Sequence, residues 1–306
     1  MTALKVGWFL GFRELRRASL WTTILIVAVM TLTFLNLVVV SGILVGLIQG
    51  SVDANREGYS GDVIVSTLTT KTYIEGSDDI IAYTRSIPGV KAVSGRYTTG
   101  ASVEADFKTK LRANDVPNRG AGLIAGIDPV AEDELTGLSN RIIEGEYLTR
   151  EDTDAVVLGA NLLYRYTPID SPGFQILKGA EIGDRLRLKV GAVEKEVTFK
   201  GVVRSKVNDV DLRIFMNEVE LRQLIGRSDR NVDEIAIKVD PGTDPVTVKN
   251  LLVRAGFGEQ GRILTFEEAQ PKFLKDIIDT FALLGNLIGA VGLVVAAITI
   301  FIVMFV

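Results

Sequence analysis

The sequence contains neither cysteine nor histidine in its 306 positions. Without cysteine the chain forms no disulfide and has no thiolate nucleophile, and the usual clue to the redox compartment is missing. Without either residue type, the common zinc sites and the Ser–His and Cys–His nucleophile pairs are excluded. No G-x-x-x-x-G-K-[ST] phosphate loop occurs, so the chain itself is not expected to hydrolyse ATP. We therefore predict no catalytic residue, no cofactor and no metal site, and expect a protein that is not an enzyme.

Charge is missing from two long stretches of the chain. No charged residue occurs from Ala18 to Val52, and none occurs from Thr280 to Val306. A bilayer core of about 30 Å needs about 20 apolar helical residues, and both stretches supply them. The first is also too long for the apolar core of a secretory signal. We predict transmembrane helices at 18–50 and 280–306, and the alternative for the first is a buried helix of a soluble protein.

Between the two stretches the chain reads as ordinary soluble protein. It holds 30 of the 34 Lys and Arg residues and 37 of the 38 Asp and Glu residues, which makes it acidic. An acidic segment without a basic run is not expected to bind nucleic acid. Asp209 and Asp211 have a spacing compatible with a calcium site, but a solvated turn is the favoured interpretation. We predict that 51–279 forms a folded domain large enough to bury its own core.

The distribution of basic residues predicts the orientation in the membrane. Residues 1–17 contain Lys5, Arg13, Arg16 and Arg17 against the single acid Glu14, whereas no basic excess follows the first stretch. The positive-inside rule therefore places the N-terminus in the cytoplasm and the large domain outside it, although Lys272 and Lys275 oppose this orientation. The apolar and basic residues of 1–17 separate on a helical wheel, which is typical of an amphipathic helix in the cytoplasmic interface. A cytoplasmic extension of the first membrane helix is the alternative for 1–17.

Hydrophobic periodicity predicts a mixed α+β domain. Two β-α-β units are expected, one at each end of the domain, and such units commonly form a sheet with helices on one face. Between them, at about 140–226, we predict an inserted β-rich subdomain. The predicted strands are Asp62–Ser66, Val90–Val103, Ala155–Leu158, Arg185–Val190, Glu194–Val203, Leu212–Met216, Glu234–Val239 and Arg262–Thr265; the predicted helices are Asp78–Ser86, Gly159–Tyr166, Glu218–Ile225 and Pro245–Ala255.

Small residues spaced four apart occur in both predicted membrane helices. Gly42 and Gly46 lie on one face of the first, and Gly285 and Gly289 lie on one face of the second. Such residues let helix backbones approach closely in lipid, where packing rather than hydrophobicity drives association. We predict that these four glycines form helix-packing faces, with chance as the alternative because glycine is common in membrane helices.

The approach to the second membrane helix contains a capping signal. Thr265 and Glu268 have the spacing of a capping box, in which each side chain accepts a hydrogen bond from the other residue's backbone N–H. We predict that the helix beginning there is a stalk running toward the membrane, with a bend near Pro271.

The order of several short motifs resembles the FtsX/MacB-type ABC transporter permease family. The motifs are Ile127–Pro129 (IDP), Glu144–Tyr147 (EGEY), Ala155–Gly159 (AVVLG), Gly179–Leu188 (GAEIGDRLRL) and Phe199–Val203 (FKGVV), in which the glycine is earlier than in the family. Each motif is weak by itself, but they occur in the family's order, and the resemblance in layout covers nearly the whole chain. The resemblance implies an outer MacB-like periplasmic core domain with a β-α-β part split by an insertion, which is the layout that the periodicity predicts.

The resemblance also implies partners and a location. Members of this family typically form homo- or heterodimers in the cell membrane and work with a cytoplasmic ABC ATPase, so membrane lipid is a further partner. They use ATP-driven motion to export a substrate, to release a lipoprotein or to regulate cell-wall hydrolases. The family usually has four spans, and this sequence reaches the second. The alternative is a membrane-tethered binding or sensing module without transport activity.

Overall fold

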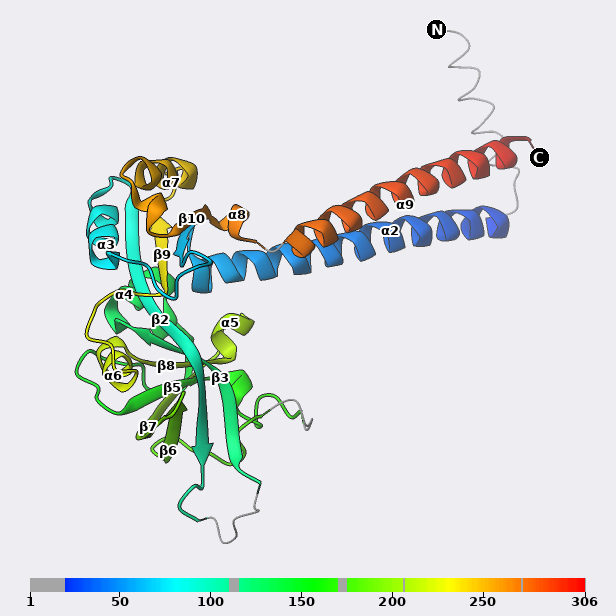
Figure 1. Cartoon of the computed structure of the whole chain (residues 1–306). Coiled ribbons are helices and arrows are strands. Elements are labelled where there is room, and N and C mark those ends of the chain that lie inside the picture. The colour runs from blue at the N-terminus through cyan, green and yellow to red at the C-terminus, as the bar shows by residue number, and fades with distance from the viewer. Residues whose placement is uncertain (1–19, 110–115, 170–174, 206, 271, 306) are drawn as a thin grey trace. The chain divides into compact units, whose positions relative to one another are not determined.

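A computed structural model describes residues 20–109, 116–169, 175–205, 207–270 and 272–305 (Figure 1). The chain divides into two compact units: one comprises residues 1–50 and 270–306, and the other comprises Ser51–Ala269. The predicted core domain of 51–279 therefore begins where the second unit begins and extends ten residues beyond its end. The predicted amphipathic helix at 1–17 lies outside the described residues.

The first unit contains the long helices α2 (Leu20–Asn55), which continues into the second unit, and α9 (Lys272–Phe305). The two helices include residues 20–50 and 280–305 of the predicted stretches, so the helical character of these residues is confirmed. Among the described residues, no helix meets the length and hydropathy criteria for a membrane span. The placement of α2 and α9 in a membrane stays a prediction.

The glycine faces of these helices are open within this chain. A Cβ atom added at Gly42, Gly46 or Gly289 would meet no other heavy atom within 4 Å, among the described surroundings. The helix-packing role predicted for these glycines and for Gly285 is therefore not tested by contacts inside one chain.

The second unit is built on a ten-stranded mixed sheet. The strand order is β10-β1-β9-β2-β3-β8-β5-β7-β4, and β6 pairs with β2 and β7. The strands are β1 (Val63–Ser66), β2 (Val90–Ala105), β3 (Asn118–Ile127), β4 (Ile142–Gly145), β5 (Ala155–Gly159), β6 (Arg185–Val190), β7 (Val193–Val203), β8 (Arg213–Asn217), β9 (Glu234–Val239) and β10 (Arg262–Thr265). The helices are α3 (Ser77–Ser86), α4 (Pro129–Thr136), α5 (Asn208–Asp211), α6 (Glu218–Leu224), α7 (Pro245–Arg254) and α8 (Phe266–Ala269), with shorter turns η1 (Arg56–Ser60), η2 (Leu138–Arg141), η3 (Ala160–Leu162) and η4 (Phe257–Glu259).

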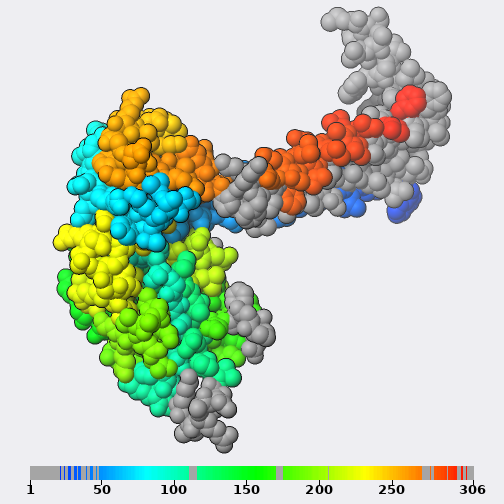
Figure 2. All heavy atoms as spheres, in the orientation of Figure 1, coloured from blue at the N-terminus to red at the C-terminus, as the bar shows by residue number. Residues whose placement is uncertain are grey.

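The two predicted β-α-β units are present and interleaved. The unit β1-α3-β2 and the unit β9-α7-β10 share four neighbouring strands, in the order β10-β1-β9-β2. The side chains of α3 and of the segment after α7 meet where the ring of Tyr83 lies edge-on to that of Phe257 at 5.3 Å between centroids. Figure 2 shows α3 and the α7 region side by side at one end of this unit.

Alternation along the central strands separates two faces of the sheet. Val93 on β2 and Ile235 on β9 belong to the main hydrophobic core. Their neighbours in sequence, Ala92 on β2 and Ala236 on β9, instead pack with Leu135 of α4. Because successive strand residues point to opposite faces, α4 covers one face and the main core lies on the other.

The middle segment joins the same sheet through a closed ring of six strands. The ring runs β2-β3-β8-β5-β7-β6 and returns to β2, where Ala101–Glu104 pair with Arg187–Val190 of β6. β2 is 16 residues long, which lets it pair with β9 in its first half and with β6 in its second half. The strands of the predicted subdomain at 140–226 are thus continuous with the rest of the sheet, and a separate boundary there stays a prediction.

The helix predicted at Gly159–Tyr166 is wrong beyond its first turn. Only the short turn η3 forms, because Leu163 is extended and the chain turns to pair with another segment. Tyr164 N–H donates to Leu177 O and Leu177 N–H donates to Leu162 O, at 2.8 and 2.9 Å. Tertiary hydrogen bonds therefore replace the local helical bonds that the sequence pattern favoured.

The prediction of a solvated turn around Asp209 and Asp211 is also wrong, most clearly at Asp211. The segment is the short helix α5, and Asp211 is 4% exposed. Its Oδ1 accepts a hydrogen bond from Ser205 N–H at 2.6 Å, so its carboxylate stabilises the preceding loop rather than facing solvent. Among the described residues, no group of His, Cys, Asp or Glu is arranged to hold a metal ion.

Candidate functional site

The candidate site begins where α2 ends in the second unit. The π-helical turn η1 follows Asn55 directly and ends at Gly61, which has φ +68°. A Cβ atom at Gly61 would lie 2.6 Å from the backbone oxygen of Ile237 on β9. Only glycine therefore allows the chain both to turn here and to approach the sheet so closely.

Asp62 ties three elements together immediately after this turn. Its Oδ1 accepts from Arg56 Nε of η1 at 2.7 Å, and its Oδ2 accepts from the N–H of Val239 on β9 at 2.8 Å. Its backbone oxygen accepts from the N–H of Phe266, the first residue of α8, at 2.9 Å. One residue thus connects the turn after α2, the sheet and the helix that precedes α9.

The strands that follow η1 and precede α8 are hydrogen-bonded neighbours. β1 and β10 are antiparallel, with Val63 opposite Thr265 and Ser66 opposite Arg262. The segments of this unit that connect to α2 and to α9 therefore lie side by side on two adjacent strands. If one strand moves along its axis, either the hydrogen bonds between the two strands must break or the other strand must move with it.

A buried ionic network lies on the α4 face of the sheet. At its centre is Arg96 on β2, which is 0% exposed. Its Nε and Nη2 donate to the two carboxylate oxygens of Glu132 on α4 at 2.9 and 2.7 Å, and its Nη1 donates to Glu234 Oε1 at 2.6 Å. Glu132 also accepts from Ser94 Oγ at 2.8 Å. Bidentate, charge-assisted bonds of this kind are the strongest that side chains form.

Strand register explains why these residues meet. Arg96 lies directly opposite Glu234 in the β2–β9 ladder, and its side chain is on the same face as that of Ser94, two residues earlier. The helix α4, which begins with Asp128 as its N-cap and Pro129 at its first position, lies over this face and carries Glu132. Burial disfavours the charge of Arg96, but Glu132 and Glu234 outweigh it and raise the pKa of Arg96 above its ordinary value.

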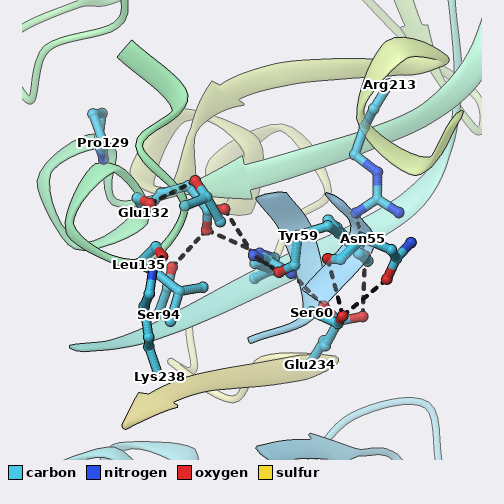
Figure 3. Close-up of polar contacts among 12 residues, drawn as sticks. Asn55, Tyr59, Ser60, Ser94, Pro129, Glu132, Leu135, Arg213, Glu234 and Lys238 are labelled. Atoms are coloured by element: carbon cyan, nitrogen blue, oxygen red, sulfur yellow. Dashed lines mark hydrogen bonds and ion pairs between the residues drawn. The ribbon is translucent and has the colours of Figure 1, made fainter. Parts of the chain in front are cut away.

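Tyr59 of η1 connects the end of α2 to this network. Its backbone oxygen accepts from Arg96 Nη2 at 2.6 Å, and the Arg96 guanidinium lies 4.3 Å from the centroid of its ring. Its hydroxyl donates to Glu234 Oε2 at 3.1 Å and accepts from Arg213 Nη1 at 2.6 Å. Figure 3 shows Tyr59 in the region of these polar contacts, with Arg213, Glu234 and Glu132 around it. Burial, reinforced by Glu234, raises the pKa of Tyr59 to about 12, so the hydroxyl is neutral and can donate.

The network around Arg96 and Tyr59 is suited to fastening η1 to the sheet rather than to proton transfer. Arg96 remains charged and Tyr59 remains neutral across the physiological range, so neither exchanges protons as an acid–base catalyst would. Removing one partner of a buried ion pair costs about 3–5 kcal/mol, because the other charge is left buried without compensation. The network therefore fastens η1 to β2, β9 and α4.

Comparison with protein families identifies the fold. The family model of the MacB-like periplasmic core domain matches residues 23–255. The chain belongs to this family. No curated protein sequence matches the chain.

Two solved structures match this chain at low sequence identity. The periplasmic region of MacB from Actinobacillus actinomycetemcomitans is 12% identical, with a TM-score of 0.49, and the match covers 76% of this chain and 97% of that one. The extracellular domain of the ABC-type transporter YknZ from Gram-positive bacteria is 13% identical, with a TM-score of 0.43, and the match covers 66% of this chain and 98% of that one.

Two of the residues predicted for the stalk, Thr265 and Glu268, have hydrogen bonds of their own that do not include the ionic network. Thr265 and Glu268 form the two hydrogen bonds of a capping box: Thr265 N–H donates to Glu268 Oε2 at 3.0 Å and Glu268 N–H donates to Thr265 Oγ1 at 3.4 Å. Lys249 of α7 adds an ion pair to Glu268 at 2.6 Å. Pro271 lies outside the described residues, and the stalk role of this segment stays a prediction.

Sequence reasoning missed Tyr59, Arg96 and their partners. The one local signal was an arginine in the middle of a strand that is otherwise largely buried. Its carboxylate partners are 36 and 138 positions away, so no local pattern joins them.

Proposed function

We propose that this chain is the permease subunit of an ABC transporter of the MacB/FtsX/lipoprotein-release type. In this proposal α2 and α9 cross the cell membrane, the N-terminus is cytoplasmic and the MacB-like domain is extracytoplasmic. A separate cytoplasmic ATPase supplies the energy, and the chain transmits its motion to the outer domain. Family membership over residues 23–255 supports the proposal.

The observation that carries the mechanism is the pairing of β1 with β10. Motion of α2 reaches β1 through η1, and motion of α9 reaches β10 through α8. Because the two strands share a ladder, the outer domain responds to the difference between the two motions. The Tyr59–Arg96 contacts prevent η1 from unwinding under load, since they must break before η1 separates from β2.

The proposed partners follow the same mechanism. A second permease copy, identical or related, would form the other half of the transporter. The open positions Gly42, Gly46 and Gly289, together with Gly285, are suited to close helix contacts in lipid. The cargo is a lipoprotein or another hydrophobic substrate.

Co-purification tests the proposal directly. The full chain carries an affinity tag, is co-expressed with a candidate ABC ATPase from the same organism, and is solubilised in mild detergent. We expect the ATPase to co-purify, and a non-hydrolysable ATP analogue to change amide hydrogen exchange both in residues 56–66 and in β2. Arg96→Met should keep the ATPase bound but lose the nucleotide-dependent change in β2.

Arg185→Gln is the matched control and should behave as the wild type, because Arg185 is exposed and, among the described residues, its side chain donates to Thr198 Oγ1 alone. Failure of the ATPase to associate with the full chain would overturn the proposal. A stable membrane protein without an ATPase partner would instead support a tethered binding or sensing module.

A further inference from the structure

An open cavity of about 570 Å³ lies beside the end of α2, between β3, η3 and α5. Leu123, Leu162, Ile176 and Leu212 provide its apolar wall, and Asn161 and Asn208 add polar groups. Leu123 is 49% exposed, which is unusual for a leucine in the middle of a strand. The volume falls in the range of about 300–1,000 Å³ typical of small-molecule sites.

A buried cation lines the same cavity. Arg213 is 4% exposed, and its Nη1 donates to the neutral hydroxyl of Tyr59. Its Nε has no hydrogen-bond partner, and among the described residues no carboxylate lies within ion-pair distance of its guanidinium. A buried arginine is normally paired with an acid, because a charge without one retains a large desolvation cost. Arg213 is therefore prepared to accept an anionic group from outside the chain.

Asp209 is the carboxylate on the cavity wall and opposes this attraction. It is exposed, and its Oδ2 already accepts a hydrogen bond from Asn55 at 3.1 Å. Interactions of an exposed charge are screened by water and salt, whereas those of a buried charge act at a lower effective dielectric constant. The attraction of Arg213 for an anion in contact with it therefore exceeds the repulsion from Asp209.

We propose that this cavity binds a small anionic amphiphile, with a carboxylate or phosphate at Arg213 and an apolar chain against Leu123, Leu162 and Ile176. This inference goes beyond the proposed function, because binding requires neither the ATPase nor transport. Two cavity residues contact the junction of α2 and η1: Asp209 accepts from Asn55, the last residue of α2, and Arg213 donates to Tyr59 of η1. A bound anion draws Arg213 away from Tyr59, so occupancy of the cavity alters the attachment of η1.

Photo-crosslinking tests the proposal on the full chain in lipid nanodiscs. The probes are eight-carbon chains with the same terminal diazirine and three different heads: a carboxylate, an alcohol and a trimethylammonium. Labelled sites are mapped by mass spectrometry. We expect the carboxylate probe to label the region of Leu123 and Ile176, with about tenfold lower yield for the alcohol, because a hydrogen bond to a charged group contributes about 1.5–3 kcal/mol.

Variants identify the group that binds the head. Arg213→Gln should reduce carboxylate labelling about tenfold on the same energetic basis, whereas Arg213→Lys should retain part of it. Because Arg213 also contacts Tyr59, Ala121→Leu serves as a second variant: it fills the cavity from an exposed position and should abolish labelling there. Arg185→Gln should label as the wild type.

A lipid-linked probe identifies the source of the head group, and two other outcomes would overturn the proposal. The same diazirine chain is also supplied on an anionic phospholipid within the nanodisc; labelling of the cavity by that probe supports a lipid head group, and labelling by the free acid supports a soluble acid. Equal cavity labelling by the carboxylate and trimethylammonium probes, or wild-type labelling in both Arg213→Gln and Ala121→Leu, would overturn the proposal.

Discussion

At the scale of single residues, Arg96 is the centre of the buried ionic network. It is buried completely and uses four contacts, two to Glu132, one to Glu234 and one to the Tyr59 backbone. Such an ion pair adds little net stability compared with a well-packed apolar group, but it is costly to break. Its value to this protein is that it fixes one position of η1 relative to the sheet.

Arg96→Met should therefore destabilise the domain by about 3–5 kcal/mol, because Glu132 is left buried and unpaired. The double variant Arg96→Met/Glu132→Leu should recover part of this loss, since neither charge then remains at the pair. Thermal unfolding of the full chain in detergent, followed by near-ultraviolet circular dichroism, measures both. A double variant less stable than Arg96→Met would contradict the buried-charge explanation.

Asp128 provides a pH-dependent test at the same scale. It caps α4 by accepting from Val130 N–H at 3.1 Å, and it pairs with Arg150 at 2.6 Å. Burial raises its pKa, but the bonds from Arg150 and Val130 outweigh burial and hold the pKa below its ordinary value of 3.8. A depressed carboxyl pKa contributes stability above pH 3.8 that is lost as the pH falls through the folded-state pKa.

Asp128→Asn keeps a capping oxygen but removes the charge. We expect a loss of up to about 1 kcal/mol at pH 7, the upper end for a solvent-accessible pair, and no difference from the wild type once the wild-type carboxyl is protonated. Denaturant unfolding at pH 7 and in steps toward pH 3 measures the difference. A gap that stays constant over this range would exclude the Arg150 ion pair as its cause.

At the scale of elements, the turn between η1 and β1 depends on glycine for two reasons. Gly61 has φ +68°, and its neighbour Ile237 leaves no room for a Cβ atom. Gly179 has nearly the same φ, +69°, but open space around it. Gly179→Ala should cost about 1 kcal/mol for the left-handed conformation alone, whereas Gly61→Ala should cost clearly more because β1 must also move from β9.

The two alanine variants differ only in the crowding at Gly61, so their difference in unfolding free energy isolates it. Equal losses in denaturant unfolding would show that the close approach of Gly61 to Ile237 is not important for stability.

The capping box before α9 is the second element-scale test. Thr265→Ala removes the hydroxyl that accepts from Glu268 N–H and should destabilise α8 by about 1 kcal/mol, which corresponds to roughly fivefold faster amide exchange there. Hydrogen exchange with mass spectrometry measures this. Thr247→Ala, at the start of α7, is the control and should leave α8 unchanged. Unaltered exchange in α8 of the Thr265 variant would argue against the cap.

At the scale of the whole molecule, the proposed topology is open to direct labelling because the chain has no cysteine of its own. Ala192→Cys places one thiol in the exposed turn between β6 and β7, and Thr2→Cys places one near the N-terminus. A membrane-impermeant maleimide should label Ala192→Cys in intact spheroplasts and should label Thr2→Cys only after lysis. The reverse pattern would contradict an extracytoplasmic domain.

The regular strands were predictable from the sequence, because apolar and polar side chains alternate along them. Glu234–Val239, Arg262–Thr265 and Arg185–Val190 begin and end as predicted. β3 was missed because its glycines suggest a loop. A Cβ atom at Gly122 would lie 2.3 Å from Leu212 O, and one at Gly126 would lie 2.8 Å from the Leu221 side chain. Glycine is therefore required at these positions by close contacts with residues that are distant in the chain.

The sequence by itself determined the features that depend on neighbouring residues: two long helices built on uncharged stretches, the period of most strands, the capping box at Thr265 and the absence of thiol and imidazole side chains. Only the tertiary structure decided which strands pair, how β6 closes the six-stranded ring, and that Arg96, Glu132, Glu234 and Tyr59 meet beside the end of α2. The reason is physical: local periodicity acts over a few residues, whereas ladder pairing and ion-pair burial join residues whose separation in the chain leaves no periodic signal.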